Sequence, residues 1–189
     1  VGEARGRVVL ATFASNVSRL QQAVDAAVAF KRKVIVLGRS MVNVTEIAQE
    51  RGYLNIPEGT LIDVDEMGRY RDDEIMILTT GSQGEPMAGL SRMATNNHRT
   101  IEITPNDTII ISATPIPGNE AAVGRTIDNL LRLGADVIYG RDRGIHVSGH
   151  GSQEDLKTML NLVRPKFFIP VHGEYRMLKK HGELAVSMG

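Results

Sequence analysis

The feature that most constrains the fold is a set of five short runs of apolar, mostly β-branched residues. They occupy residues 7–12, 33–38, 74–79, 108–112 and 136–139. A strand with one solvent-exposed face would alternate apolar and polar residues. These runs do not, so we predict strands that are covered on both faces. Turn-forming residues and stretches with helical spacing separate the runs. This order predicts an α/β fold with a mostly parallel, Rossmann-like sheet and helices on both faces.

Helical spacing of apolar residues locates the connecting elements. A first helix is expected from Val17, with the Ser15 hydroxyl as its N-cap, and a second helix from Val44. Further elements are expected as follows: helices over residues 121–133 and 152–162, the latter ended by Pro165, and a sixth strand over residues 166–171.

Composition excludes several classes of protein. With 42% hydrophobic residues the chain is too apolar to be disordered, and its apolar runs are far shorter than the roughly 18 residues of a membrane span. The 22 basic and 22 acidic side chains give a formal net charge of zero. Because there is no cysteine, any metal must be bound by His, Asp or Glu. We therefore expect a soluble, cytoplasmic protein.

Polar residues and glycines follow each of the first four strands. Arg39, Ser40, Gly81 and Ser82 stand in two of these loops, and residues 12–16 and 112–120 form the others. Because the carboxyl ends of parallel strands share one edge of the sheet, where open α/β folds bind ligands, we expect the four loops to lie together. Hydroxyls, backbone amides and a guanidinium beside helix N-termini are suited to binding an anion. Each loop taken alone also fits an ordinary turn.

The loops lack the motifs of ATP- and dinucleotide-binding proteins. Gly81 and Gly84 are three residues apart with no Gly-Lys-Ser/Thr after them, and no strand is followed by Gly-x-Gly-x-x-Gly. A phosphate site without the lysine of a nucleotide P-loop fits a polynucleotide backbone better than a free nucleotide.

Three of the five histidines stand where an α/β site presents metal ligands or acid–base groups. His146 and His150 are four residues apart on either side of Ser148, and His172 directly follows an apolar run. A lone histidine of this kind is as readily structural. The other two stand in polar surroundings and are expected at the surface: His98 and His181.

Six segments together resemble one family: residues 11–16, 38–43, 79–86, 115–120, 146–152 and 170–176. In these segments the sequence is similar to the ribonuclease J family, bacterial members of the β-CASP branch of the metallo-β-lactamase superfamily, and the resemblance covers essentially the whole chain. It implies a zinc-dependent ribonuclease with 5′-to-3′ exonuclease and endonuclease activity, which processes and degrades RNA and prefers 5′-monophosphorylated RNA.

The resemblance also implies roles for single residues. His150 matches a histidine that contacts the scissile phosphate and protonates the leaving oxygen. His172 matches a ligand of one of two zinc ions. The candidates for binding the RNA and its 5′-phosphate are Arg39, Ser40, Gly81, Ser82, Ser148 and His146, the last also through second-shell hydrogen bonds.

The resemblance divides the chain into two parts. Residues 1–150 resemble the β-CASP domain, and residues 151–189 resemble the segment that returns to the metallo-β-lactamase domain. The His-x-His-x-Asp-His motif and most zinc ligands of the family are absent from this sequence. We therefore expect the chain alone to be inactive and to need the rest of that domain, and the full-length enzyme to form a homodimer or tetramer. The alternative from the residues alone is a non-catalytic α/β module that binds phosphate or nucleotide.

Overall fold

The computed structural model describes residues 1–140, 144–145 and 150–189. The chain divides into two compact units, residues 1–147 and residues 148–189. The elements of the first unit are, in chain order, β1 (Val8–Ala11), α1 (Val17–Ala29), β2 (Lys33–Val36), α2 (Arg39–Glu50), the 3-10 helices η1 (Val64–Arg69) and η2 (Asp72–Glu74), β3 (Ile75–Thr79), α3 (Gly89–Ala94), β4 (Thr108–Ile111), α4 (Glu120–Arg132) and β5 (Asp136–Ile138).

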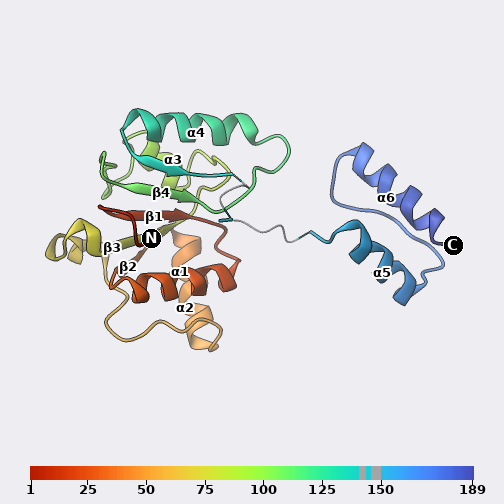
Figure 1. Ribbon diagram of the computed structural model, residues 1–189, viewed down its shortest axis with the longest axis horizontal. Coiled ribbons are helices and arrows are strands. Elements are labelled where there is room, and N and C mark those ends of the chain that lie inside the picture. Colours follow the sequence, from red (N-terminus) through yellow and green to blue (C-terminus); the bar gives the residue numbers. More distant parts are fainter. Residues whose placement is uncertain (141–143, 146–149) are drawn as a thin grey trace. The chain divides into compact units, whose positions relative to one another are not determined.

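The strands of this unit form one sheet in the order β2-β3-β1-β4-β5. Every pairing between these described strands is parallel. Helices α1 and α2 lie on one side of the sheet and α3 and α4 on the other (Figure 1). The structure thus confirms the predicted α/β class, the parallel sheet and the helices on both faces.

Alternate residues of each strand enter two separate hydrophobic cores. In β1, Val8 and Leu10 pack with the apolar residues of α1 and α2, whereas Val9 and Ala11 pack with those of α3 and α4. Successive side chains of a strand point to opposite faces, so a sheet covered on both sides needs apolar residues at every position. This is why the strand sequences lack polar alternation.

The order of the strands creates a crevice at the carboxyl edge of the sheet. Strands β1 and β3 are neighbours, but the chain leaves β1 for α1 on one face and leaves β3 for α3 on the opposite face (Figure 1). The two loops therefore diverge after adjacent strands. Open α/β sheets bind ligands at such a switch point.

Two helix starts differ from the sequence prediction. The N-cap of α1 is Asn16 and not Ser15, because the Asn16 Oδ1 accepts a hydrogen bond from the Arg19 amide at 3.1 Å. Helix α2 begins at Arg39 and not near Val44. The residues that we expected in a loop after β2 therefore form the first turn of a helix.

A buried ion pair joins the start of β1 to the turn before β4. Arg7 Nε donates to Asp107 Oδ1 at 2.8 Å and Arg7 Nη2 donates to Asp107 Oδ2 at 2.5 Å. The same carboxylate accepts from the Thr104 amide, and the guanidinium also donates to the Glu102 carbonyl. Asp107 is fully buried and Arg7 is 6% exposed. Both charges are thus hydrogen-bonded in a site that water does not reach.

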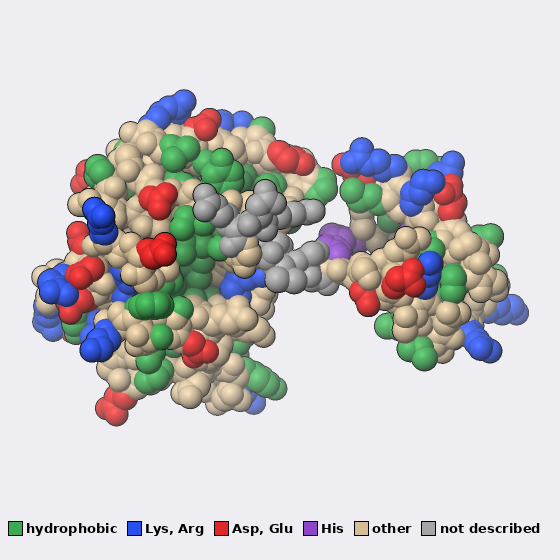
Figure 2. Space-filling model, viewed as in Figure 1, with side chains coloured by type: hydrophobic (Ala, Val, Ile, Leu, Met, Phe, Trp, Pro, Cys, Tyr) green, Lys and Arg blue, Asp and Glu red, His purple; other side chains and the backbone are tan. Residues whose placement is uncertain are grey.

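The second unit contains α5 (Gln153–Val163) and α6 (Tyr175–Ser187). Helix α5 matches the prediction and ends before Pro165, with Arg164 in the left-handed region. Helix α6 was not predicted. The strand expected over residues 166–171 was a wrong prediction, because no described strand pairs with this segment and three of its apolar side chains, Phe167, Ile169 and Val171, are exposed. Apolar side chains are visible on the surface of this unit (Figure 2).

Within the described part of the chain, no helix combines the length and the apolar character that crossing a membrane requires.

Candidate functional site

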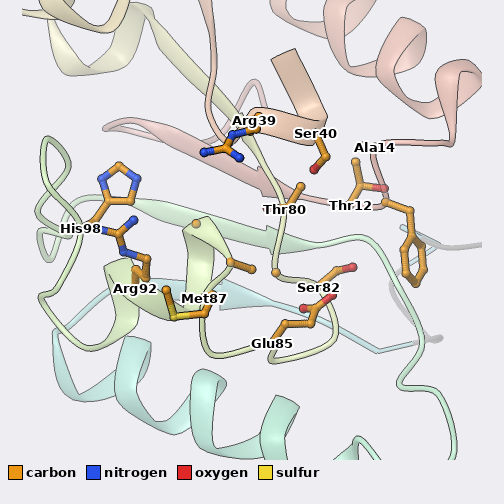
Figure 3. A pocket seen from close by; sticks show the side chains of 15 residues that line it. Thr12, Ala14, Arg39, Ser40, Thr80, Ser82, Glu85, Met87, Arg92 and His98 are labelled. Carbon is orange, nitrogen blue, oxygen red and sulfur yellow. The ribbon is translucent and has the colours of Figure 1, made fainter. Parts of the chain in front are cut away.

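A pocket of about 780 Å³ opens at the crevice between β1 and β3. Its walls come from the loop after β1, the first turn of α2, the loop after β3 and the region of α3 (Figure 3). Four predicted phosphate-binding residues line it together: Arg39, Ser40, Gly81 and Ser82. Loops that are far apart in the sequence thus meet at one site.

The first turn of α2 supplies a cation and free backbone amides. No side chain caps this helix, because its N-cap is Gly38 with φ of +98°. Arg39 forms no hydrogen bond or ion pair with any residue that the structure describes, and Ser40 beside it is exposed. Uncapped amides at a helix N-terminus, a serine hydroxyl and an unpaired guanidinium favour an anion.

The loop after β3 is held in one conformation by close packing. Gly81 has φ of +108°, and a Cβ there would come within 3.1 Å of Ala88 and Leu90. Gly84 has φ of +71°, and a Cβ would lie 2.5 Å from the Ala122 backbone. Both positions therefore require glycine. Ser82, between them, is only 2% exposed and lines the pocket.

Gln83 joins this loop to the loop after β4. Its side-chain amide donates to the Thr114 carbonyl at 3.0 Å, and its Oε1 accepts from the Ile116 amide at 2.7 Å. Gln83 is 3% exposed. The loop after β4 thus stands next to the pocket but does not line it, so three of the four expected loops build its walls.

Sequence reasoning missed one side of the pocket. We expected His98 at the surface, but it is half-buried and lines the pocket together with Arg92 of α3 (Figure 3). Burial, and secondarily the charge of Arg92, lower the pKa of His98. The sequence signal was an arginine and a histidine close together after the Gly81 loop, but nothing in their spacing shows that α3 folds back to the crevice.

His150 and His172 belong to the second unit. Their rings are stacked, with centroids 5.6 Å apart and an interplanar angle of 5°. His172 has φ of +65°, a conformation that is uncommon for a residue with a side chain. His146 and Ser148 lie outside the described residues.

The described residues supply part of a metal site at most. In residues 1–140, 144–145 and 150–189, no three His, Asp or Glu side chains form a group that could hold a metal ion. A catalytic zinc needs about three protein ligands. The imidazole of His172 is of a kind that binds zinc, but no complete ligand set surrounds it among these residues.

Two protein-family models match this chain, one after the other along the sequence. Residues 5–130 match the family described as "Ribonuclease J, beta-CASP domain", and residues 134–189 match the "Zn-dependent metallo-hydrolase RNA specificity domain". This chain belongs to the ribonuclease J family. The resemblance that the sequence motifs indicated is thereby confirmed.

Relatives in the ribonuclease J family are similar over the full length of this chain. Ribonuclease J of Helicobacter pylori is 50% identical over 187 residues, 99% of this chain and 27% of the relative. Ribonuclease J of Corynebacterium glutamicum is 52% identical over 100% of this chain and 26% of the relative. Ribonuclease J2 of Bacillus subtilis is 46% identical over 98% of this chain and 33% of the relative. The chain thus spans about a quarter to a third of the length of these relatives.

Proposed function

We propose that this chain is the RNA-binding part of a zinc-dependent ribonuclease with 5′-to-3′ exonuclease and endonuclease activity. Residues 1–150 act as the β-CASP domain and residues 151–189 complete the metallo-β-lactamase domain. The substrate is RNA, preferably with a 5′-monophosphate, and the full-length enzyme works as a homodimer or tetramer. Membership of the ribonuclease J family supports this proposal.

The observation that carries the proposal is the unpaired Arg39 at the N-terminus of α2, inside a pocket also lined by Ser82. Glu85 is the one carboxylate among the described residues that line this pocket. Its carboxylate accepts a hydrogen bond from the backbone N–H of Gln83 at 3.1 Å and makes no ion pair with Arg39. A guanidinium, backbone amides and a buried hydroxyl suit the two charges of a terminal phosphate better than the single charge of a phosphodiester.

The histidines of the second unit have separate roles in the proposal. His150 contacts the scissile phosphate and gives a proton to the leaving oxygen. His172 is one ligand of a two-zinc site, and zinc bound there supplies a Lewis acid and an activated water. Ser148 takes part in binding the 5′-phosphate, and His146 supports either site through second-shell hydrogen bonds.

We expect the 189-residue chain alone not to degrade RNA above background, with or without added zinc. The reason is that the His-x-His-x-Asp-His motif of the family is absent from its sequence. The measurement is loss of a labelled 5′-monophosphorylated RNA over time, with a mock purification as the control for contaminating nucleases. Metal-dependent turnover that co-purifies with the chain would contradict the expectation.

Arg39→Gln tests the phosphate pocket. We expect the wild-type chain to bind 5′-monophosphorylated RNA more tightly than the same RNA with a 5′-hydroxyl, and we expect this preference to fall about tenfold or more in the variant, because a charge-assisted hydrogen bond to phosphate is lost. Titration of both RNAs at one salt concentration measures it.

The control for this test is Arg51→Gln, because Arg51 is an exposed arginine at the opposite end of α2. The Arg51→Gln variant should prefer 5′-monophosphorylated RNA over 5′-hydroxyl RNA as strongly as the wild type does. Equal affinity of the wild-type chain for the two RNAs would argue against a 5′-phosphate pocket. An unchanged preference in Arg39→Gln would remove Arg39 from it.

A further inference from the structure

Ser112 joins three parts of the first unit at the carboxyl edge of the sheet. It directly follows β4 and is 3% exposed. Its amide donates to the Ala11 carbonyl at the end of β1 at 2.9 Å, and its hydroxyl donates to the Ile145 carbonyl. The Ile145 side chain packs against the core on the α1 and α2 side of the sheet. The chain is therefore fixed at Ile145 by apolar packing and by a hydrogen bond from a buried serine.

Arg19 of α1 holds the backbone of Ser112. Its Nη1 donates to the Ser112 carbonyl at 2.8 Å and to the Thr12 hydroxyl at 3.5 Å. Among the described residues no Asp or Glu forms an ion pair with Arg19. Its charge therefore serves these neutral acceptors, and a charged donor makes a stronger hydrogen bond than a neutral one. The backbone of Ser112 is thus held at its amide and at its carbonyl.

The anchored carbonyl stands directly before the segment that carries two of the candidate histidines. Ile145 precedes His146, and His150 follows five residues after Ile145. Because a peptide unit is planar, a hydrogen bond to its carbonyl oxygen also sets the direction in which the chain continues. Each residue extends a chain by at most about 3.5 Å. The bond to Ile145 therefore limits both the direction and the distance over which the chain can carry the His150 imidazole.

We propose that Ser112 is a positioning residue for the reaction, because its bond to the Ile145 carbonyl orients residues 146–150. This inference rests on the proposed function. In that reaction water gives a proton to the solvent, its oxygen bonds to phosphorus, the bond from phosphorus to the leaving oxygen breaks, and His150 protonates that oxygen. An acid acts only within hydrogen-bond reach of the atom that it protonates, and a misplacement of about 1 Å can cost about a hundredfold in rate. Arg19 acts through Ser112.

Ser112→Ala in a full-length protein that contains this chain tests the proposal. The substitution removes the hydroxyl but keeps the amide and carbonyl that bond to Ala11 and Arg19. Two 5′-monophosphorylated RNAs are compared, one normal and one with sulfur in place of the leaving oxygen of the first linkage. Thiols ionise at about pH 8.5, so sulfur leaves as a thiolate without a proton from an acid. In single turnovers, we expect first cleavage to slow about tenfold or more for normal RNA and less than about twofold for the sulfur RNA.

Ser91→Ala is the matched control for this substitution. Ser91 is 7% exposed, and its hydroxyl has no hydrogen-bond partner in the part of the chain that the structure describes. The control therefore removes a buried hydroxyl without removing a hydrogen bond, and it should cleave both RNAs like the wild type. Zinc content should stay unchanged in Ser91→Ala and in Ser112→Ala.

Variants of Arg19 and His150 locate the effect. Arg19→Met should slow cleavage of normal RNA about three- to tenfold. Arg19→Lys should recover most of this loss, because an ammonium group can also donate to the Ser112 carbonyl. His150→Ala is the reference for loss of the acid, and it should slow normal RNA about a hundredfold or more and the sulfur RNA far less.

Each outcome decides the inference. No loss in Ser112→Ala, or equal losses on the two RNAs, would overturn it. If His150→Ala discriminates between the RNAs and Ser112→Ala does not, the proposed function stands and this inference fails. If His150→Ala slows both RNAs equally, the acid role in the proposed function fails and the inference fails with it. If Ser112→Ala is unfolded by circular dichroism, unchanged or equally reduced rates on the two RNAs in Arg19→Met overturn the inference.

Discussion

Replacing His172 by alanine in a full-length protein that contains this chain is expected to remove zinc and to stop RNA cleavage. Loss of a second-shell partner costs a metal enzyme about 10- to 100-fold in affinity or activity, and the loss of a ligand itself should exceed this. We therefore expect turnover to fall more than about a hundredfold, with the zinc content falling from two ions toward one. Metal analysis and a ribonuclease assay on the same preparation measure both.

Two other histidines of the second unit serve as comparisons. His181 packs edge-on against the Phe168 ring at 4.8 Å, so His181→Ala should keep its zinc and its turnover. His150→Ala should lose turnover while it keeps its zinc, because His150 is proposed as the acid and not as a ligand. Unchanged zinc content in His172→Ala would show that His172 does not bind the metal.

Asp107→Ala is expected to destabilise the first unit by about 3–5 kcal/mol, the usual loss when one partner of a buried ion pair is removed. The substitution leaves the Arg7 guanidinium buried without its carboxylate and frees the Thr104 amide. Urea unfolding followed by circular dichroism measures the change as a lower midpoint with an unchanged slope.

Two further variants make this test specific. Asp73→Ala breaks an exposed pair with Arg71 and should stay within about 0.5 kcal/mol of the wild type. The double variant Arg7→Met with Asp107→Leu removes both charges and should recover much of the loss, because no buried charge remains unpaired. A change below about 1 kcal/mol in Asp107→Ala would contradict a stabilising role for the pair.

The five strands of the sheet were predictable from the composition of their sequences. Apolar, β-branched runs buried on both faces have few other structures open to them, and each predicted run contains an observed strand. The segment over residues 166–171 is also largely apolar, but it contains Pro170, and a strand also needs a hydrogen-bonding neighbour. None is present among the described residues of its unit, and Phe167, Ile169 and Val171 are 76–81% exposed. The sequence of a segment does not show whether a neighbouring strand is available to pair with it.

The two sides of the pocket differed in how far the sequence predicted them. Two pairs of residues closely follow strands: Arg39 and Ser40 follow β2, and Gly81 and Ser82 follow β3. Because the carboxyl ends of parallel strands lie at one edge of the sheet, the sequence alone places these residues together. Arg92 and His98 stand more than ten residues after the end of β3. They reach the crevice because α3 packs on the same face of the sheet as α4. This depends on tertiary contacts, which the sequence does not display.

Alternate side chains of each central strand pack in two different cores. The sheet is therefore disrupted by insertion or deletion of a residue in a strand as well as by substitution. Removing one residue from the middle of β1 would exchange the sets that face α1 and α4, and the small Ala11 would then take a place shaped for a larger side chain. Conservative swaps between Val, Ile and Leu keep this alternation. Length changes are therefore best placed in the exposed stretch around residues 57–59, where the chain passes outside both cores.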